Sequence, residues 1–87
     1  MTYRIEILPS AIKELGQLPI KERKRIDKRI QSLAVDPRPS GVIAMQGSHK
    51  GLLRLRVGNY RIIYSIEEQR LVVIVVKVGH RQDVYRD

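Results

Sequence analysis

Two runs of alternating apolar and polar residues flank a two-residue turn in the second half of this 87-residue chain. The runs span residues 53–57 and 60–66, and Gly58-Asn59 separates them. Runs of this kind around a glycine-containing pair are typical of a β-hairpin closed by a type I′ or II′ turn. A second short connection, 67–69, leads into residues 70–78, which are nearly all apolar, as in a central strand covered on both faces. The sequence therefore predicts three consecutive strands in an antiparallel sheet.

The first half of the chain shows helical spacing after one short strand. Residues 3–8 alternate as a strand does, and Pro9 ends this strand and begins a helix that stops near Gln17. A second helix is predicted from Pro19 to the stretch 36–40, whose two prolines exclude helix. The first half therefore predicts one strand followed by a helical hairpin.

The middle of the chain predicts a loop. Residues 41–51 hold three glycines and show no sustained period, so any strand there, around 42–45, is brief. The order of elements is then β-α-α-β-β-β. We expect an α+β fold, a two-layer domain in which an N-terminal helical hairpin packs on one face of an antiparallel β-sheet and leaves the other face open.

Length and composition restrict both the class of protein and its location. The 87 residues suffice for a single domain, 1–87, because so short a chain buries only about 60% of its unfolded surface. The chain contains no cysteine, which excludes a disulfide framework and a thiol nucleophile and fits a reducing compartment. It shows no signal-peptide pattern, and its longest apolar run, 71–76, is far below the roughly 20 residues of a membrane-spanning helix. We expect a soluble, cytoplasmic protein with no membrane partner.

The chain is strongly basic, with 17 Lys and Arg residues against 9 Asp and Glu and a net charge of +8. This charge sits on a sequence with globular hydrophobic content, so it causes self-repulsion in the folded state, as expected where the partner is a polyanion. Arginine predominates, and its planar guanidinium binds phosphate bidentately. The alternative is a generally basic protein without such a partner. With two histidines and no thiol, we expect neither a metal site nor another cofactor.

The pairing predicted across the hairpin brings three arginines together. Arg54, Arg56 and Arg61 share one face of the sheet, and the apolar residues between them point to the core. No carboxylate occurs from residue 37 to 66, so the anion that offsets these charges must come from elsewhere. The alternative is that the arginine stems merely cover apolar sheet surface. The position of Lys77 relative to this cluster stays open, because a one-residue shift in register would reverse its face.

The hairpin and the C-terminal segment carry a family resemblance. The specific blocks are Leu55-Arg56, Gly58-Asn59-Tyr60-Arg61-Ile62-Ile63-Tyr64 and Val78-Gly79-His80-Arg81-Gln82-Asp83-Val84-Tyr85. Together with the opening strand and the helix pair, they resemble the RelE branch of the RelE/ParE superfamily, toxins of type II toxin–antitoxin systems. The resemblance implies a ribosome-dependent, metal-independent mRNA endonuclease (an mRNA interferase). Such an enzyme cuts mRNA in the ribosomal A site by attack of the ribose 2′-hydroxyl on the adjacent phosphate, and so inhibits translation.

The resemblance also implies the roles of four catalytic residues. Arg61 holds the scissile phosphate, Arg81 neutralises the charge that develops on it, and Tyr85 is the general base. Arg54 matches the second of two alternating basic residues on the family's hairpin strand. The first of these two positions is Leu52 in this sequence, which departs from the family pattern.

Leu52 leaves the general acid unidentified. Arginine is a poor proton donor, so Arg54 is expected to stabilise the leaving oxygen by charge. The alternatives for proton donation are Lys50, His49 and His80. The residues expected to bind RNA besides the catalytic four are Lys50, Arg56, Lys77, His80, Lys24, Arg25 and Lys28. The last three belong to a basic run in the second helix, which is alternatively a solvated face.

We expect two kinds of partner. One is the ribosome with its mRNA, and the other is a cognate RelB-like antitoxin, a small protein that wraps the toxin with an acidic or amphipathic segment. Two other functions stay open: a ParE-like toxin that inhibits DNA gyrase, and an RNA-binding module whose catalysis is weakened at Leu52. The combination of Arg61, Arg81 and Tyr85 favours the nuclease.

Overall fold

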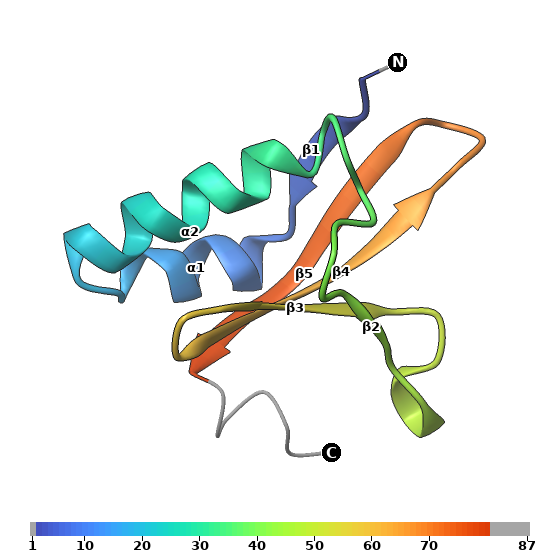
Figure 1. Cartoon of the computed structure of the whole chain (residues 1–87). Helices are drawn as coiled ribbons and strands as arrows, with labels where there is room; N and C mark the ends of the chain where they lie inside the picture. Colours follow the sequence, from blue (N-terminus) through green and yellow to red (C-terminus); the bar gives the residue numbers. More distant parts are fainter. Residues whose placement is uncertain (1, 81–87) are drawn as a thin grey trace.

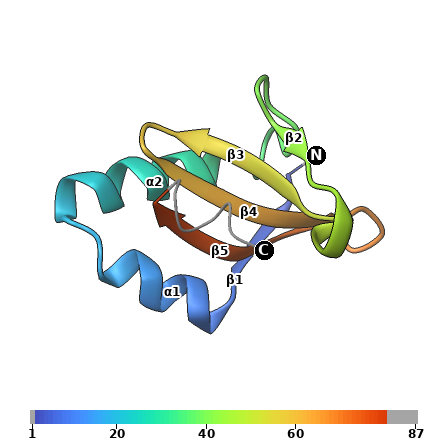
Figure 2. The same cartoon turned by 90° about the horizontal axis from the view of Figure 1, so that it is seen from below.

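The computed structural model describes residues 2–80 and confirms the expected α+β class (Figure 1). In chain order the elements are β1 (Arg4–Ile7), α1 (Pro9–Gly16), α2 (Ile20–Ser32), β2 (Ile43–Ala44), the 3-10 turn η1 (Gly47–His49), β3 (Leu53–Val57), β4 (Tyr60–Glu67) and β5 (Val72–His80). The five strands form one sheet in the order β1-β5-β4-β3-β2. Figure 1 shows the two helices together on one side of this sheet, and Figure 2 shows β3, β4 and β5 side by side.

Both helices bury an apolar stripe against the sheet. Pro9 begins α1, at a position where the N–H group that it lacks would have no helical partner, and Ala11 and Leu15 are buried. In α2, Ile26 and Ile30 lie one turn apart and are fully buried. In the described part of the chain, neither helix is long and apolar enough to cross a membrane.

The sheet is mixed because its first strand is parallel to its last. β3 pairs antiparallel with β4, and β4 with β5, as predicted, whereas β1 pairs in parallel with β5. β4 occupies one edge of β5 and leaves the other edge for β1, and the long chain between β1 and β5 permits either direction. The alternation of residues 3–8 encodes a strand but not its direction. The brief strand expected around 42–45 is β2, which pairs with β3 at the other edge of the sheet.

The predicted register of the hairpin is confirmed. Arg56 lies opposite Arg61, and Arg54 lies opposite Ile63. Gly58 has a φ of 61°, in the left-handed region that glycine adopts without strain. The three arginines therefore share the face of the sheet that points away from the helices, which we call the open face.

A bulge in β5 determines the face of Lys77. Ile63 pairs with Lys77, but the next residue, Tyr64, pairs with Val75, so Val76 has no residue opposite it. This extra residue shifts the alternation of β5 by one position. Lys77 consequently shares the open face with Ile63.

Tyr64 links the sheet to the loop that follows α2. Its side chain is fully buried, and its hydroxyl donates a 2.7 Å hydrogen bond to the carbonyl oxygen of Pro37. Burial raises the pKa of Tyr64 to about 12, because the phenolate is disfavoured away from water. The neutral phenol thus anchors the loop to the core.

Candidate nucleic-acid interface

The hairpin end of the open face carries the three arginines that the sequence predicts as the site. Among the described residues, Arg61 is the one charged side chain that is buried, with 4% exposure. Its Nη1 donates a 3.3 Å hydrogen bond to the carbonyl oxygen of Tyr60, and Arg56 Nε donates a 3.2 Å bond to that of Gly58. These bonds hold two guanidinium groups at the hairpin turn, next to Arg54 on β3. Because Arg61 is largely shielded from water, its charge is screened less than that of a solvated arginine.

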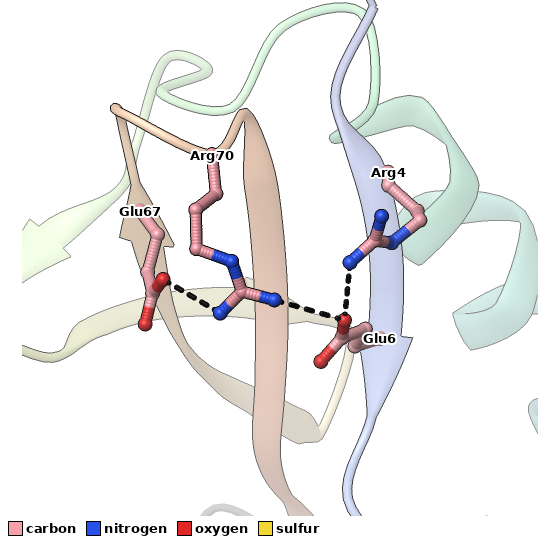
Figure 3. A network of polar contacts seen from close by, with 4 residues as sticks. All are labelled: Arg4, Glu6, Glu67 and Arg70. Carbon is pink, nitrogen blue, oxygen red and sulfur yellow. Dashed lines mark hydrogen bonds and ion pairs between the residues drawn. The ribbon is translucent and has the colours of Figure 1, made fainter.

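The opposite end of the open face is close to neutral. There Arg4 lies 2.7 Å from Glu6, and Arg70 lies 3.0 Å from Glu67 and 3.7 Å from Glu6 (Figure 3). Val72, between Arg4 and Glu67 in the sheet, is fully buried. The hydrogen bond from Arg4 lowers the pKa of Glu6, which keeps this carboxylate ionised. Two cations are balanced by two carboxylates here, so this end of the face contributes little net charge.

Lys77 shares the open face by register, but its ammonium group contacts α1. Its Nζ lies 2.8 Å from Glu14 Oε2, and the N–H of Val78 donates a 2.9 Å hydrogen bond to Glu14 Oε1. Glu14 thereby covers the edge of β5 beyond the end of β1. The structure does not bring the Lys77 ammonium to the arginine cluster.

His80 is the last residue of the described chain and lies opposite Tyr60. The two rings are 5.7 Å apart and meet edge to face at 78°. This contact holds His80 at the hairpin end of the sheet, the end that carries the arginines. Arg81 and Tyr85, predicted to act in catalysis, lie outside the described residues.

Part of the predicted basic run of α2 faces the hairpin. Arg25 and Lys28 line a cavity of about 410 Å³ together with Arg29 of the same helix and Arg56 of β3. Arg29 is absent from the residues predicted to bind RNA, although its spacing of four from Arg25 signals a shared helix face. Lys24 is exposed and does not line this cavity.

Lys50 and Leu52 stand immediately before β3. Lys50 is exposed, and Leu52 is half-buried. The N–H of Leu52 donates a 3.1 Å hydrogen bond to the carbonyl oxygen of His49, and its carbonyl accepts a 2.9 Å bond from Met45. Because it lies two residues before Arg54, Leu52 continues the alternation on the open face. An apolar side chain thus stands next in line to the arginines.

The chemistry available at this end of the sheet is electrostatic. Guanidinium groups bind phosphate oxygens bidentately and stabilise the added charge of a pentacoordinate phosphorus. In the described part of the chain, no group of three or more acidic or histidine side chains is placed to hold a metal ion. Fold and site together define a small basic α+β domain with a cluster of arginines at one end of an open sheet face.

Comparison with known proteins identifies the family. The family model described as ParE toxin of type II toxin-antitoxin system, parDE, matches residues 5–85. The chain therefore belongs to this family of toxins, and within it to the RelE-like toxins, as the resemblance predicted.

Three similar proteins illustrate this relationship, two over the whole chain and one over 93% of it. Putative toxin RelE1 of Methanocaldococcus jannaschii is 26% identical over 90 residues, which cover 100% of this chain and 99% of the relative. The mRNA interferase toxin RelE of Escherichia coli is 28% identical over 91 residues, with 100% and 94% covered. A chain in the crystal structure of the archaeal RelE–RelB complex from Pyrococcus horikoshii is 32% identical, with a TM-score of 0.80 and 93% of this chain and 97% of that chain covered.

Proposed function

We propose that this RelE-like toxin is a ribosome-dependent mRNA endonuclease that cuts the message in the A site and so inhibits translation, without a metal or other cofactor. The observation that carries this proposal is the cluster of Arg54, Arg56 and Arg61 on an open sheet face, within a stretch, 37–66, that contains no carboxylate. Similarity to a protein named mRNA interferase supports RNA as the polyanion.

The proposed reaction is an attack of the ribose 2′-oxygen on the adjacent phosphorus. The P–O bond to the 5′-oxygen breaks, the 5′-hydroxyl leaves with a proton, and a 2′,3′-cyclic phosphate remains. A dianionic phosphorane lies between these states, and one fixed donor at its equatorial oxygens is typically worth about 3–4 kcal/mol. Arg61 is proposed to hold the phosphate, and Arg81 to neutralise the added charge.

Two proton transfers accompany the attack. Tyr85 is the proposed general base, because neighbouring cations favour the phenolate that must accept the 2′-hydroxyl proton. Arg54 is proposed to stabilise the leaving oxygen by charge. The proposed sources of the proton for the leaving oxygen are Lys50, His49 and His80, of which His80 lies at the hairpin end against Tyr60.

We also propose a cognate RelB-like antitoxin as partner. The similarity to RelE in a solved RelE–RelB complex supports this partner. Ile12 on α1 and Ile20 on α2 are 56% and 62% exposed, so an amphipathic segment laid over the helices would remove apolar surface from water. Co-expression with such a protein should restore growth of cells that produce the toxin.

The family model favours one second candidate, a ParE-like toxin that inhibits DNA gyrase. In that case the arginines would serve in binding alone, and neither Arg81 nor Tyr85 would be needed for a chemical step. The two candidates therefore differ in whether RNA is cut.

An assay with purified protein and ribosomes stalled on a defined mRNA distinguishes these functions. We expect new 3′ ends at a fixed position within the A-site codon and no inhibition in a parallel gyrase supercoiling assay. An Arg81→Ala, Tyr85→Ala double variant should not cut. Absence of codon-positioned cleavage, or equal cleavage by the double variant, would refute the nuclease, and gyrase inhibition in its place would establish the second candidate.

A further inference from the structure

A cavity of about 410 Å³ lies between α2 and the hairpin end of β3. The lining residues that carry charge or shape its mouth are Arg25, Lys28 and Arg29 from the helix and Arg56 and Gly58 from the hairpin. No carboxylate is among the described residues that line it. The cavity is distinct from the open face, although Arg56 at the sheet edge borders both.

The cations around this cavity are poorly compensated within the described structure. Arg25, Lys28 and Arg29 are spaced by three and four residues on one helix, so their charges repel one another. Their ion-pair partner among the described residues is Glu22, 4.0 Å from an Arg25 side chain that is 57% exposed. Four cations elsewhere each have a carboxylate oxygen within 3.0 Å: Arg4, Arg38, Arg70 and Lys77. An anion in the cavity would remove the repulsion that the chain leaves there.

The hairpin turn brings two guanidinium groups together at one glycine. A Cβ atom built on Gly58 would lie 2.8 Å from Arg25 Nη1, so the Arg25 guanidinium rests directly on the turn. Arg56 Nε donates a hydrogen bond to the Gly58 carbonyl oxygen. One arginine from α2 and one from β3 thus lie at the same point of the turn. The bond to Gly58 holds Arg56 there before any ligand arrives, which lowers the entropy that binding would cost.

The edge of β3 adds a backbone donor. β2 pairs only with Leu53 and Arg54, so β3 has no neighbour on that side at Arg56. In a two-residue hairpin the backbone N–H and C=O groups of the closing pair, Val57 and Tyr60, point toward each other. The backbone N–H and C=O of Arg56, the preceding residue on β3, then point away from β4. The N–H of Arg56 therefore points to the free edge that borders the cavity.

We propose that this cavity binds a phosphodiester of an RNA backbone, as a second RNA contact outside the proposed catalytic face. This proposal rests on the proposed function only in its choice of RNA as the polyanion. A phosphate gains its binding energy from charge and needs no apolar anchor. An acidic peptide of comparable affinity needs to bury an apolar or aromatic anchor against apolar surface. The apolar residue that lines this cavity, Val57, is already buried in the core, with 8% of its surface exposed, so it offers little such surface.

The test compares two double variants of the full chain that remove the same charge from the same helix. Lys28→Gln with Arg29→Gln removes two cations from the cavity, and Lys21→Gln with Arg23→Gln removes a lysine and an arginine that do not line it. Glutamine preserves helix propensity in both. Binding is measured by fluorescence anisotropy at several salt concentrations with two RNA probes that carry 2′-O-methyl groups and so cannot be cut. One probe is single-stranded, as a message is, and the other is a stem-loop, as in ribosomal RNA.

We expect the cavity variant to reduce the dependence of log K on log salt by about 0.7 for the single-stranded probe or about 0.9 for the stem-loop, the change for one phosphate contact. The control variant should leave this slope close to that of wild type, and the probe whose slope changes by its full one-phosphate value identifies the source of the phosphate. Equal reductions in both variants, or none in either, would overturn the proposal. Loss of binding to a polyglutamate peptide but not to RNA would also overturn it and assign the cavity to a protein partner. Because these probes cannot be cut, the outcome is independent of whether the open face is catalytic.

Discussion

Tyr64 places a phenol in the core, where burial favours its neutral form. Its hydroxyl donates a hydrogen bond to Pro37, and burial raises its pKa to about 12. The unfolded chain loses this proton near pH 10, about the usual value for tyrosine, whereas the folded chain keeps it. The stabilisation is therefore complete below about pH 10 and is lost as pH rises through the folded-state value.

We predict different pH dependence of stability for wild type and Tyr64→Phe. At about pH 8 the variant should be less stable by about 1 kcal/mol, because the Pro37 carbonyl loses its donor. Between about pH 10 and 12 the wild type should lose stability more steeply, because the variant has no phenol to ionise at this position. Urea unfolding followed by circular dichroism at several pH values measures both effects. Parallel curves across this range would contradict the assignment.

At the scale of the element, one glycine couples the hairpin to α2. Gly58 needs its positive φ of 61° for the turn, and its missing Cβ leaves room for the Arg25 guanidinium. An alanine there carries a backbone cost of about 1 kcal/mol and also displaces Arg25. The hairpin turn and the basic face of α2 are thus structurally linked.

A double-mutant cycle tests this link. Gly58→Ala should lower the free energy of unfolding by about 1–2 kcal/mol, and adding Arg25→Ala should recover only the steric part. Gly51→Ala is the matched control, since Gly51 also has a positive φ, 96°, but has no atom within 4 Å of a built Cβ. Thermal unfolding of the single and double variants gives the coupling. The contact would be disproved if Arg25→Ala changed stability equally in the wild-type protein and in the Gly58→Ala variant.

Elements that follow from local patterns were predictable from the sequence. The hairpin register, with Arg56 opposite Arg61, followed from a turn of two residues and the period of a strand. The direction of β1 and the bulge at Val76 did not, because both depend on pairing between segments that are distant in the chain. Local periodicity carries no information about such pairing.

The candidate site likewise combines features that local sequence patterns predict with features that depend on contacts between distant segments. The cluster of Arg54, Arg56 and Arg61 followed from alternation alone. The ion pair that draws Lys77 towards α1 involves Glu14, 63 residues away, so no local pattern signals it. The participation of Arg29 in a cavity depends likewise on how α2 packs beside β3.

At the scale of the whole molecule, the net charge of +8 is unevenly distributed. One end of the open face balances its cations with carboxylates (Figure 3). The hairpin end gathers arginines from β3, β4 and α2. We therefore expect the proposed RNA partner to bind at this end of the molecule, where the proposed catalytic face and the cavity beside α2 meet at the hairpin turn.

The central claim is that arginines at the hairpin end act on RNA phosphate, and two arginine variants on the same face test it most directly. Arg61→Gln removes a cation from the proposed catalytic end, whereas Arg4→Gln removes one from the balanced end. Arg61→Lys is included as a variant that keeps the charge. Thermal unfolding of every variant separates a loss of catalysis from a loss of folding.

The decisive measurement is the rate of message cleavage on stalled ribosomes. Arg61→Gln should slow cleavage by about 10²–10³-fold, the effect of one transition-state donor, while Arg4→Gln stays within about twofold of wild type. Arg61→Lys should retain part of the rate. A folded Arg61→Gln variant that cuts at the wild-type rate, or an equal loss in Arg4→Gln, would contradict the account.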